Sequence, residues 1–201
     1  MAIVPRTVAR TARDALTKAQ ARYERWSGWW WAPPEYVATV EIAEAVHRLS
    51  GVDWVTPEHN VGDTLRVAGG GMGRPASVIP KAGRFDLVVW SGEQPAGVIE
   101  VKTKGYQTII KDVERVCAAI RNTDAIDWGV VAFIYAWGDG QRKSGKERVL
   151  DRTARLEAKA NEEAGKRGMK FTRHNGKIRV RDGGAWAAEA FQISRASAMS
   201  R

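Results

Sequence analysis

An unbroken apolar run from Trp128 to Trp137 (WGVVAFIYAW) limits the folds that are open to this chain. A strand with one wet face alternates apolar and polar side chains, whereas a continuous run is typical of a parallel strand that is buried on both faces. Such a strand needs helices over both faces of its sheet. The run therefore predicts an α/β domain with a central sheet between helical layers.

Two shorter apolar runs precede it, from Phe85 to Trp90 and from Ala96 to Val101, with the turn-like residues 91–95 between them. Apolar stripes with helical spacing predict helices over residues 35–50 and 108–121. A short strand is expected at residues 52–56. The predicted order is helix, three strands, helix, strand, which is an αβββαβ core with a mixed central sheet.

Carboxylates and a lysine stand at the ends of the two shorter runs. Asp86 begins the first run, and Glu100-Val101-Lys102 ends the second. Side chains alternate along a strand, so Glu100 and Lys102 point the same way, about 6.6 Å apart. If the strand of Asp86 pairs alongside, two carboxylates converge on one place, and such oxygen ligands suit Mg²⁺ or Mn²⁺. The lysine could then orient or deprotonate an attacking water, or stabilise charge on a phosphoryl group.

This arrangement resembles the PD-(D/E)XK nuclease superfamily, which has the restriction-endonuclease-like fold. The resemblance covers about residues 35–137 and implies that Asp86, Glu100 and the Val101 carbonyl hold the metal, while Lys102 serves the water. Phe85 stands where the family pattern has proline. A second Glu-x-Lys, at Glu157 and Lys159, follows no apolar run and is interpreted as part of a charged helix.

The resemblance also implies an acid from the first helix. Members of the superfamily often supply one that faces the metal or its water. Glu41 is our choice, with Glu44 in reserve, although both could be surface glutamates that counter Arg48.

The composition agrees with a nucleic-acid partner, DNA being our first expectation. The chain has 201 residues, 44% of them hydrophobic, and a net charge of +9 from 32 Lys and Arg against 23 Asp and Glu. Basic proteins of this size often bind polyanions. Lys104, Gln107 and Arg84 are our candidates for phosphate contacts, although a loop or capping role is the better explanation of Lys104 and Gln107.

The amino-terminal segment is a second basic feature. Residues 6–26 have the pattern of an amphipathic helix, with an arginine-rich face that includes Arg10, Arg13 and Arg22, and Trp29, Trp30 and Trp31 follow it. The helix could pack on the core or on a homodimer or protein partner through its tryptophans. Alternatively, it could contact phosphates or lie on a membrane surface.

The remaining segments complete the predicted domain organisation. We expect a second strand at residues 61–68, a glycine-rich loop at 69–73, a charged helix at 146–165, and a hairpin over 171–180 that turns at Asn175-Gly176. Residues 1–31 are interpreted as an extension, 32–193 as the nuclease-like domain and 194–201 as a tail.

The sequence thus predicts a metal-dependent nuclease, either endo- or exonucleolytic, acting on DNA or RNA. The alternatives are a non-catalytic nucleic-acid-binding or assembly module of the same fold and, from another class, a membrane-surface protein. A single cysteine, Cys117, excludes a disulfide framework, and neither a transmembrane stretch nor a signal peptide is recognisable. We therefore expect a cytoplasmic protein.

Overall fold

The computed structural model describes residues 2–28, 32–70 and 83–196. They form five helices: α1 (Pro5–Ser27), α2 (Glu35–His47), α3 (Val61–Val67), α4 (Tyr106–Arg121) and α5 (Gly145–Lys166). The seven strands are β1 (Trp54–Asn60), β2 (Arg84–Ser91), β3 (Gln94–Lys102), β4 (Trp128–Gly138), β5 (Met169–Asn175), β6 (Arg179–Arg181) and β7 (Gly184–Arg195). The α/β class is confirmed, and α2, β1, β2, β3, α4 and β4 follow in the predicted αβββαβ order, with helix α3 inserted between β1 and β2.

The strands form one mixed sheet in the order β1-β2-β3-β4-β7-β5, and β6 also pairs with β7. Strands β3 and β4 are parallel, and the other pairs are antiparallel. The prediction for the Trp128–Trp137 run is therefore confirmed. Gly97 of β3 lies opposite Trp128 of β4 and leaves room for its side chain, because a Cβ at this position would lie 2.5 Å from the indole ring.

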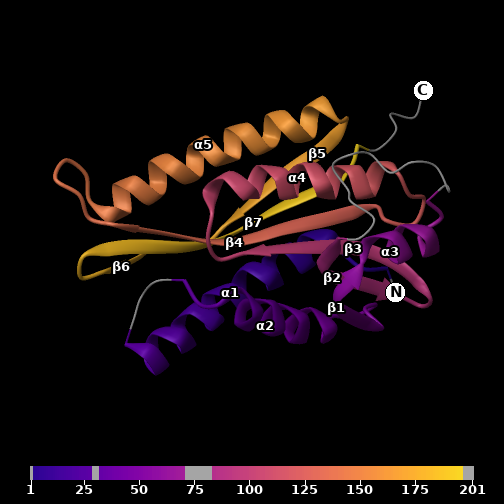
Figure 1. Cartoon of the computed structure of the whole chain (residues 1–201), viewed down its shortest axis with the longest axis horizontal. Coiled ribbons are helices and arrows are strands. Elements are labelled where there is room, and N and C mark those ends of the chain that lie inside the picture. The colour runs from indigo at the N-terminus through magenta and orange to yellow at the C-terminus, as the bar shows by residue number, and fades with distance from the viewer. Residues whose placement is uncertain (1, 29–31, 71–82, 197–201) are drawn as a thin grey trace.

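Helices cover both faces of the sheet, as Figure 1 shows. Helices α4 and α5 lie over one face, and their buried side chains, including Val116 and Leu156, pack with Phe133 and Phe191 of the sheet. On the other face, α1 and α2 pack against the sheet with side chains such as Leu16 and Ile42. The result is two apolar cores separated by the sheet.

The strand predicted at residues 61–68 is wrong, because this segment is helix α3. The Asn60 side chain caps the helix by accepting a hydrogen bond from the Asp63 amide at 3.1 Å. Val61 and Leu65 then lie one helical turn apart and contact the core. Of the glycine-rich loop, residues 71–73 lie outside the described residues.

The hairpin predicted at Asn175-Gly176 is also wrong. Strand β5 ends at Asn175 and pairs with β7, not with β6. The tight hairpin lies further along, between β6 and β7, where Arg181 faces Gly184 and Gly183 has a φ of 80°. Strand β7 continues to Arg195, so the segment assigned to the tail begins inside a strand.

Helix α1 belongs to the core and covers the sheet together with α2. Val8, Ala12 and Leu16 are fully buried in the same cluster as Ile99 of β3. The tryptophans at 29–31 lie outside the described residues. Within the described ranges, no helix combines the length and the apolar character that crossing a bilayer would need.

Candidate functional site

The site lies where β2 and β3 separate. Their pairing runs as far as Leu87 and Ile99. Beyond that point, the Val101 amide donates a hydrogen bond to Asp86 Oδ2 at 2.7 Å instead of to a backbone carbonyl. The Asp86 carboxylate thus takes the place of a ladder partner and is fixed at the end of β3.

Lys102 stands at the centre of the site and contacts three acids. Its Nζ lies 3.3 Å from Glu35 Oε1, 3.7 Å from Asp86 Oδ2 and 3.9 Å from Asp112 Oδ2. It also donates a hydrogen bond to the Val101 carbonyl at 3.0 Å. These acids come from α2, β2 and α4, so three elements orient one ammonium group.

Glu100 lies deeper, with 1% of its surface exposed. Arg115 Nη1 is 3.3 Å from Glu100 Oε1, and the Arg115 guanidinium lies over the Phe85 ring, 4.9 Å from its centroid. Neither Glu100 oxygen receives a hydrogen bond from a described residue. A buried carboxylate without such donors is costly, and the single Arg115 guanidinium offsets only part of that cost, so a proton or a second cation would stabilise Glu100.

The ionisation of the cluster follows from burial and from the excess of acids. Burial, and then repulsion from Asp86, raise the pKa of Glu100 well above its ordinary value, although Arg115 opposes the shift. Burial raises the pKa of Asp112 to about 6, against the attraction of Lys102. For Lys102, burial lowers the pKa, but Asp86, Asp112, Glu35 and Glu100 together outweigh it and raise the pKa. The lysine is therefore held as an ammonium ion.

The chemistry of these residues fits a hard divalent cation. Asp86, Glu100 and the Val101 carbonyl offer oxygen atoms, and the two Glu100 oxygens lack hydrogen-bond donors in the described residues. A cation would supply the charge that this buried carboxylate needs. Among the described residues, no three His, Cys, Asp or Glu side chains are arranged to hold a metal ion. The set suggested by the sequence has two carboxylates, with the Val101 carbonyl as its third oxygen.

The structure places Glu41 away from this cluster. Glu41 forms an ion pair with Arg22, and both side chains line a groove between α1 and α2. Glu44 pairs with Arg48. The acid that α2 brings to Lys102 is Glu35, its first residue.

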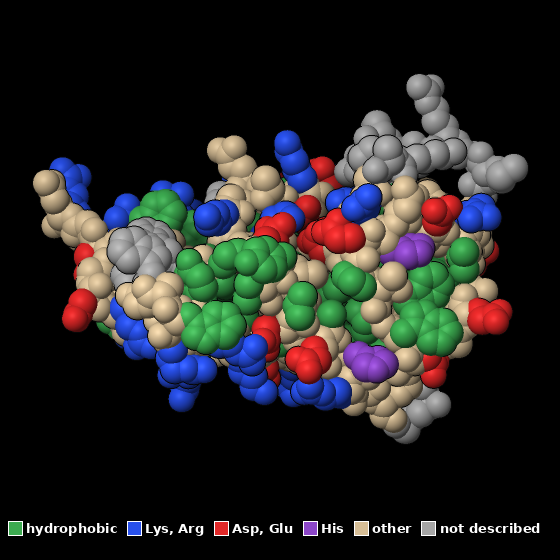
Figure 2. All heavy atoms as spheres, turned by 60° about the horizontal axis from the view of Figure 1, so that its bottom comes forward, with side chains coloured by type: hydrophobic (Ala, Val, Ile, Leu, Met, Phe, Trp, Pro, Cys, Tyr) green, Lys and Arg blue, Asp and Glu red, His purple; other side chains and the backbone are tan. Residues whose placement is uncertain are grey.

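The residues predicted to contact nucleic acid lie in three places. Lys104 lies beside Lys102, in the loop before α4, and Gln107 is exposed in the first turn of that helix. Arg84 is exposed at the start of β2, 3.9 Å from Glu58. On α1, Arg10 is exposed, whereas Arg13 donates to the Asn175 carbonyl at 3.1 Å and Arg22 is paired with Glu41. In the view of Figure 2, basic side chains lie beside hydrophobic ones.

The sequence analysis missed Glu35, Asp112 and Arg115, although the sequence holds a signal for two of them. At 100° per residue, Asp112 lies only about 60° from Ile109, inside the apolar stripe of α4. Glu35 lies in a similar position relative to Ile42 on α2. A charged side chain within an apolar stripe predicts a buried group with a partner. Arg115 lies outside the stripe and gives no such signal.

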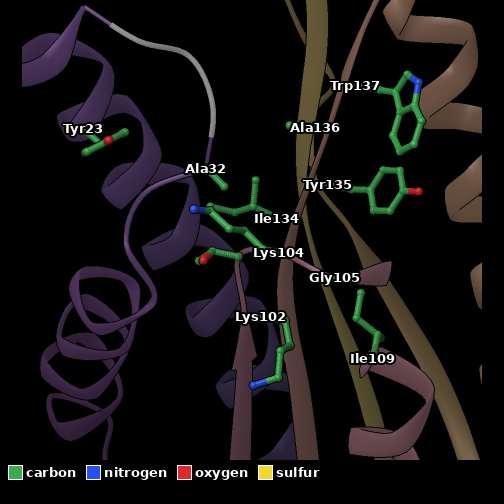
Figure 3. Close-up of a pocket in the computed structure, with 11 residues that line it drawn as sticks. Tyr23, Ala32, Lys102, Lys104, Gly105, Ile109, Ile134, Tyr135, Ala136 and Trp137 are labelled. Atoms are coloured by element: carbon green, nitrogen blue, oxygen red, sulfur yellow. The ribbon is translucent and has the colours of Figure 1, made fainter. Parts of the chain in front are cut away.

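A pocket of about 490 Å³ adjoins Lys102. It lies where β3 ends and β4 continues, and its lining includes Tyr23, Lys104, Ile109, Tyr135 and Trp137. Figure 3 shows Tyr23 approaching from α1, while Tyr135 and Trp137 project from the opposite side of β4. Gly105 has a φ of 85°, which lets the chain turn from β3 into α4 at the mouth of the pocket.

Comparisons of the chain with protein-family models, curated proteins and solved structures give no significant match. The resemblance to PD-(D/E)XK nucleases therefore rests on the residues described above and stays a prediction.

Proposed function

We propose that this protein is a metal-dependent nuclease that hydrolyses phosphodiester bonds in nucleic acid, with DNA as the first expectation. The observation that carries the proposal is the convergence of Asp86, Glu100 and Lys102 at the separating ends of β2 and β3. Two carboxylates with a carbonyl and an ammonium group supply both the ligands and the positive charge that phosphodiester hydrolysis requires.

Each residue has a distinct part in this proposal. Asp86, Glu100 and the Val101 carbonyl would hold Mg²⁺ or Mn²⁺, which supplies Lewis acidity toward a phosphoryl oxygen and makes a water more acidic. Lys102 is held charged by its four acidic neighbours. It can therefore donate hydrogen bonds to a water or to a phosphoryl oxygen, but it has no free pair to accept a proton.

Glu35 and Asp112 orient the lysine. Glu35 accepts a hydrogen bond from Lys102 Nζ at 3.3 Å, and Asp112 lies 3.9 Å from the same atom on the side of α4. We assign to Glu35 the supporting role that the sequence analysis gave to Glu41. Arg115 partly offsets the charge of Glu100 and positions it against Phe85.

The test is cleavage of labelled single strands, duplexes and flaps, of DNA and of RNA, with Mg²⁺ or Mn²⁺. We expect wild-type cleavage that EDTA stops. Asp86→Asn and Lys102→Met should each lose at least about a thousand-fold in rate, since the first removes a proposed metal ligand and the second removes the ammonium group proposed to contact the water or the phosphate. Lys159→Gln, an exposed change on α5, is the matched control and should keep the wild-type rate.

Two results would contradict the proposal. One is cleavage that persists in EDTA, and the other is a wild-type rate in both site variants. Binding of nucleic acid without cleavage of any substrate would instead identify a binding module of the same fold.

A further inference from the structure

We infer that the pocket beside Lys102 receives an unstacked nucleobase, so that the substrate enters the site as a single strand. The inference rests on the proposed function, because the pocket is placed relative to a phosphate at Lys102. It adds a substrate class and a base-binding subsite to that function.

The position of the pocket is the first argument. Strand β3 pairs with β4 as far as Lys102 and Phe133, whereas β4 continues its pairing with β7 to Gly138. The pocket fills the space beside this projecting part of β4. Lys102 belongs both to its lining and to the acidic cluster, so a nucleotide whose phosphate contacts Lys102 has its base within reach of the pocket.

The lining is the second argument. Two aromatic residues of the lining, Tyr23 and Trp137, are half-buried, whereas Tyr135 is buried beneath Trp137, with ring centroids 6.0 Å apart and an interplanar angle of 10°. Bases stack on such aromatic side chains, whatever their sequence. In an antiparallel pair, alternate residues of β4 point their backbone groups away from β7, so the open edge also offers donors and acceptors to a base. The volume of about 490 Å³ lies in the range of sites for organic ligands.

The charges around the pocket are the third argument. Lys102 and Lys104 lie at one end. At the other end, the guanidinium groups of Arg148 and Arg152 lie 4.9 and 4.6 Å from the centroid of the Trp137 ring. Cations on both sides of an aromatic pocket match a strand whose phosphates flank an extruded base. A base that is paired and stacked in a duplex cannot enter such a pocket until it is extruded.

The experiment measures binding in EDTA, so that cleavage does not interfere. A fluorescein-labelled oligothymidylate is titrated with the full-length protein, alone and annealed to its complement, and the anisotropy is followed. We expect the single strand to bind at least about five-fold more tightly than the duplex, since stacking of one base contributes about 1 to 3 kcal/mol. Ala136→Phe, which fills the pocket, should abolish this preference.

Two further variants keep the test decisive. Ala158→Phe adds the same ring to an exposed position of α5 and should bind as wild type does. If Ala136→Phe does not fold, as judged by circular dichroism, Lys104→Gln takes its place and should weaken binding of the single strand several-fold. Equal affinity of wild type for both oligonucleotides, or an unchanged preference in the pocket variants, overturns the inference.

The outcomes separate this inference from the proposed function. Cleavage of duplexes with Mg²⁺, together with unchanged binding in the pocket variants, keeps the nuclease and removes the base pocket. Conversely, loss of single-strand binding in those variants, in a protein that cleaves nothing with either metal, keeps the base pocket and removes the nuclease.

Discussion

Two buried glutamates flank β4 and have opposite surroundings. Glu189 of β7 is 2% exposed, and Arg173 donates to both of its oxygens, at 2.8 and 2.9 Å. Arg173 also bonds Glu157 at 2.7 Å, so this ionic group is saturated with hydrogen bonds. Glu100 of β3 is 1% exposed, receives no hydrogen bond from the described residues and lies near two further acids, Asp86 and Asp112.

The difference separates a structural ion pair from the candidate functional site. A buried carboxylate that is fully bonded to an arginine is held for folding, because breaking the pair leaves an uncompensated charge. A carboxylate that is buried without donors, among other acids, is costly to the fold and marks a place where a cation or a substrate supplies the missing interactions. Both glutamates have an arginine nearby. Arg173 donates hydrogen bonds to both oxygens of Glu189, whereas Arg115 lies 3.3 Å from Glu100 without donating one.

The largest expected effect on stability is at the saturated group. Arg173→Met should lower the free energy of unfolding by about 3 to 5 kcal/mol, because it leaves Glu189 buried without its partner. Urea unfolding followed by circular dichroism measures the change. A cost below about 1 kcal/mol would show that Glu189 is as uncompensated as Glu100 and would remove the contrast.

The second expected effect is stabilisation by a divalent cation. An ion that binds only the folded protein stabilises it by about 3 kcal/mol at a hundred times its Kd. We therefore expect Mn²⁺ to raise the melting temperature of the wild type and of Glu157→Gln, which changes the saturated group. The same titration should not change the melting temperature of Glu100→Gln. An equal rise in Glu100→Gln would place the bound ion elsewhere.

The third and smallest effect is a dependence of the free energy of unfolding on pH. Folding raises the pKa of Asp112 from near 4 to about 6, so the folded protein holds this proton over a range where the unfolded chain has lost it. Stability in EDTA should therefore fall as the pH rises from about 4 to above 6, by no more than about 3 kcal/mol from this group. Asp112→Asn should flatten that part of the profile of unfolding free energy against pH. A variant profile parallel to that of the wild type would contradict this assignment.

The sequence predicted the central elements because their signals are local and strong. The apolar runs of β2, β3 and β4 and the apolar stripe of α4 each identify an element from its own residues. The short segment of α3 was misread because Val61, Leu65 and Val67 fit either a helix or a strand over so few residues. Strand β7 was missed because Ala185 to Ala190 is rich in alanine, which is depleted in strands, and the strand is held by its pairing with β4 and β5.

In the predicted site, too, the residues found from the sequence have local signals, whereas the residues that were missed depend on packing between elements. Asp86, Glu100 and Lys102 were found because strand ends and alternation bring them together. Glu35 and Asp112 approach Lys102 from two helices on opposite faces of the sheet, and that contact depends on packing between elements. Glu41 was chosen by its place on α2, but the pairing with Arg22 depends on how α1 packs against α2. Sequence spacing indicates that Glu35 and Asp112 need a partner, but it does not identify Lys102 as that partner or Arg22 as the partner of Glu41.

Cleavage by two matched variants tests the central claim most directly. Glu100→Gln and Glu157→Gln each replace one carboxylate by an amide, the first in the acidic cluster and the second in the saturated group. With Mn²⁺ and a labelled single strand, we predict the wild-type rate for Glu157→Gln and a loss of at least about a thousand-fold for Glu100→Gln, since only the latter removes a proposed metal ligand. Equal rates for the two variants would contradict the account, because the buried carboxylate without hydrogen-bond donors would then have no part in the reaction.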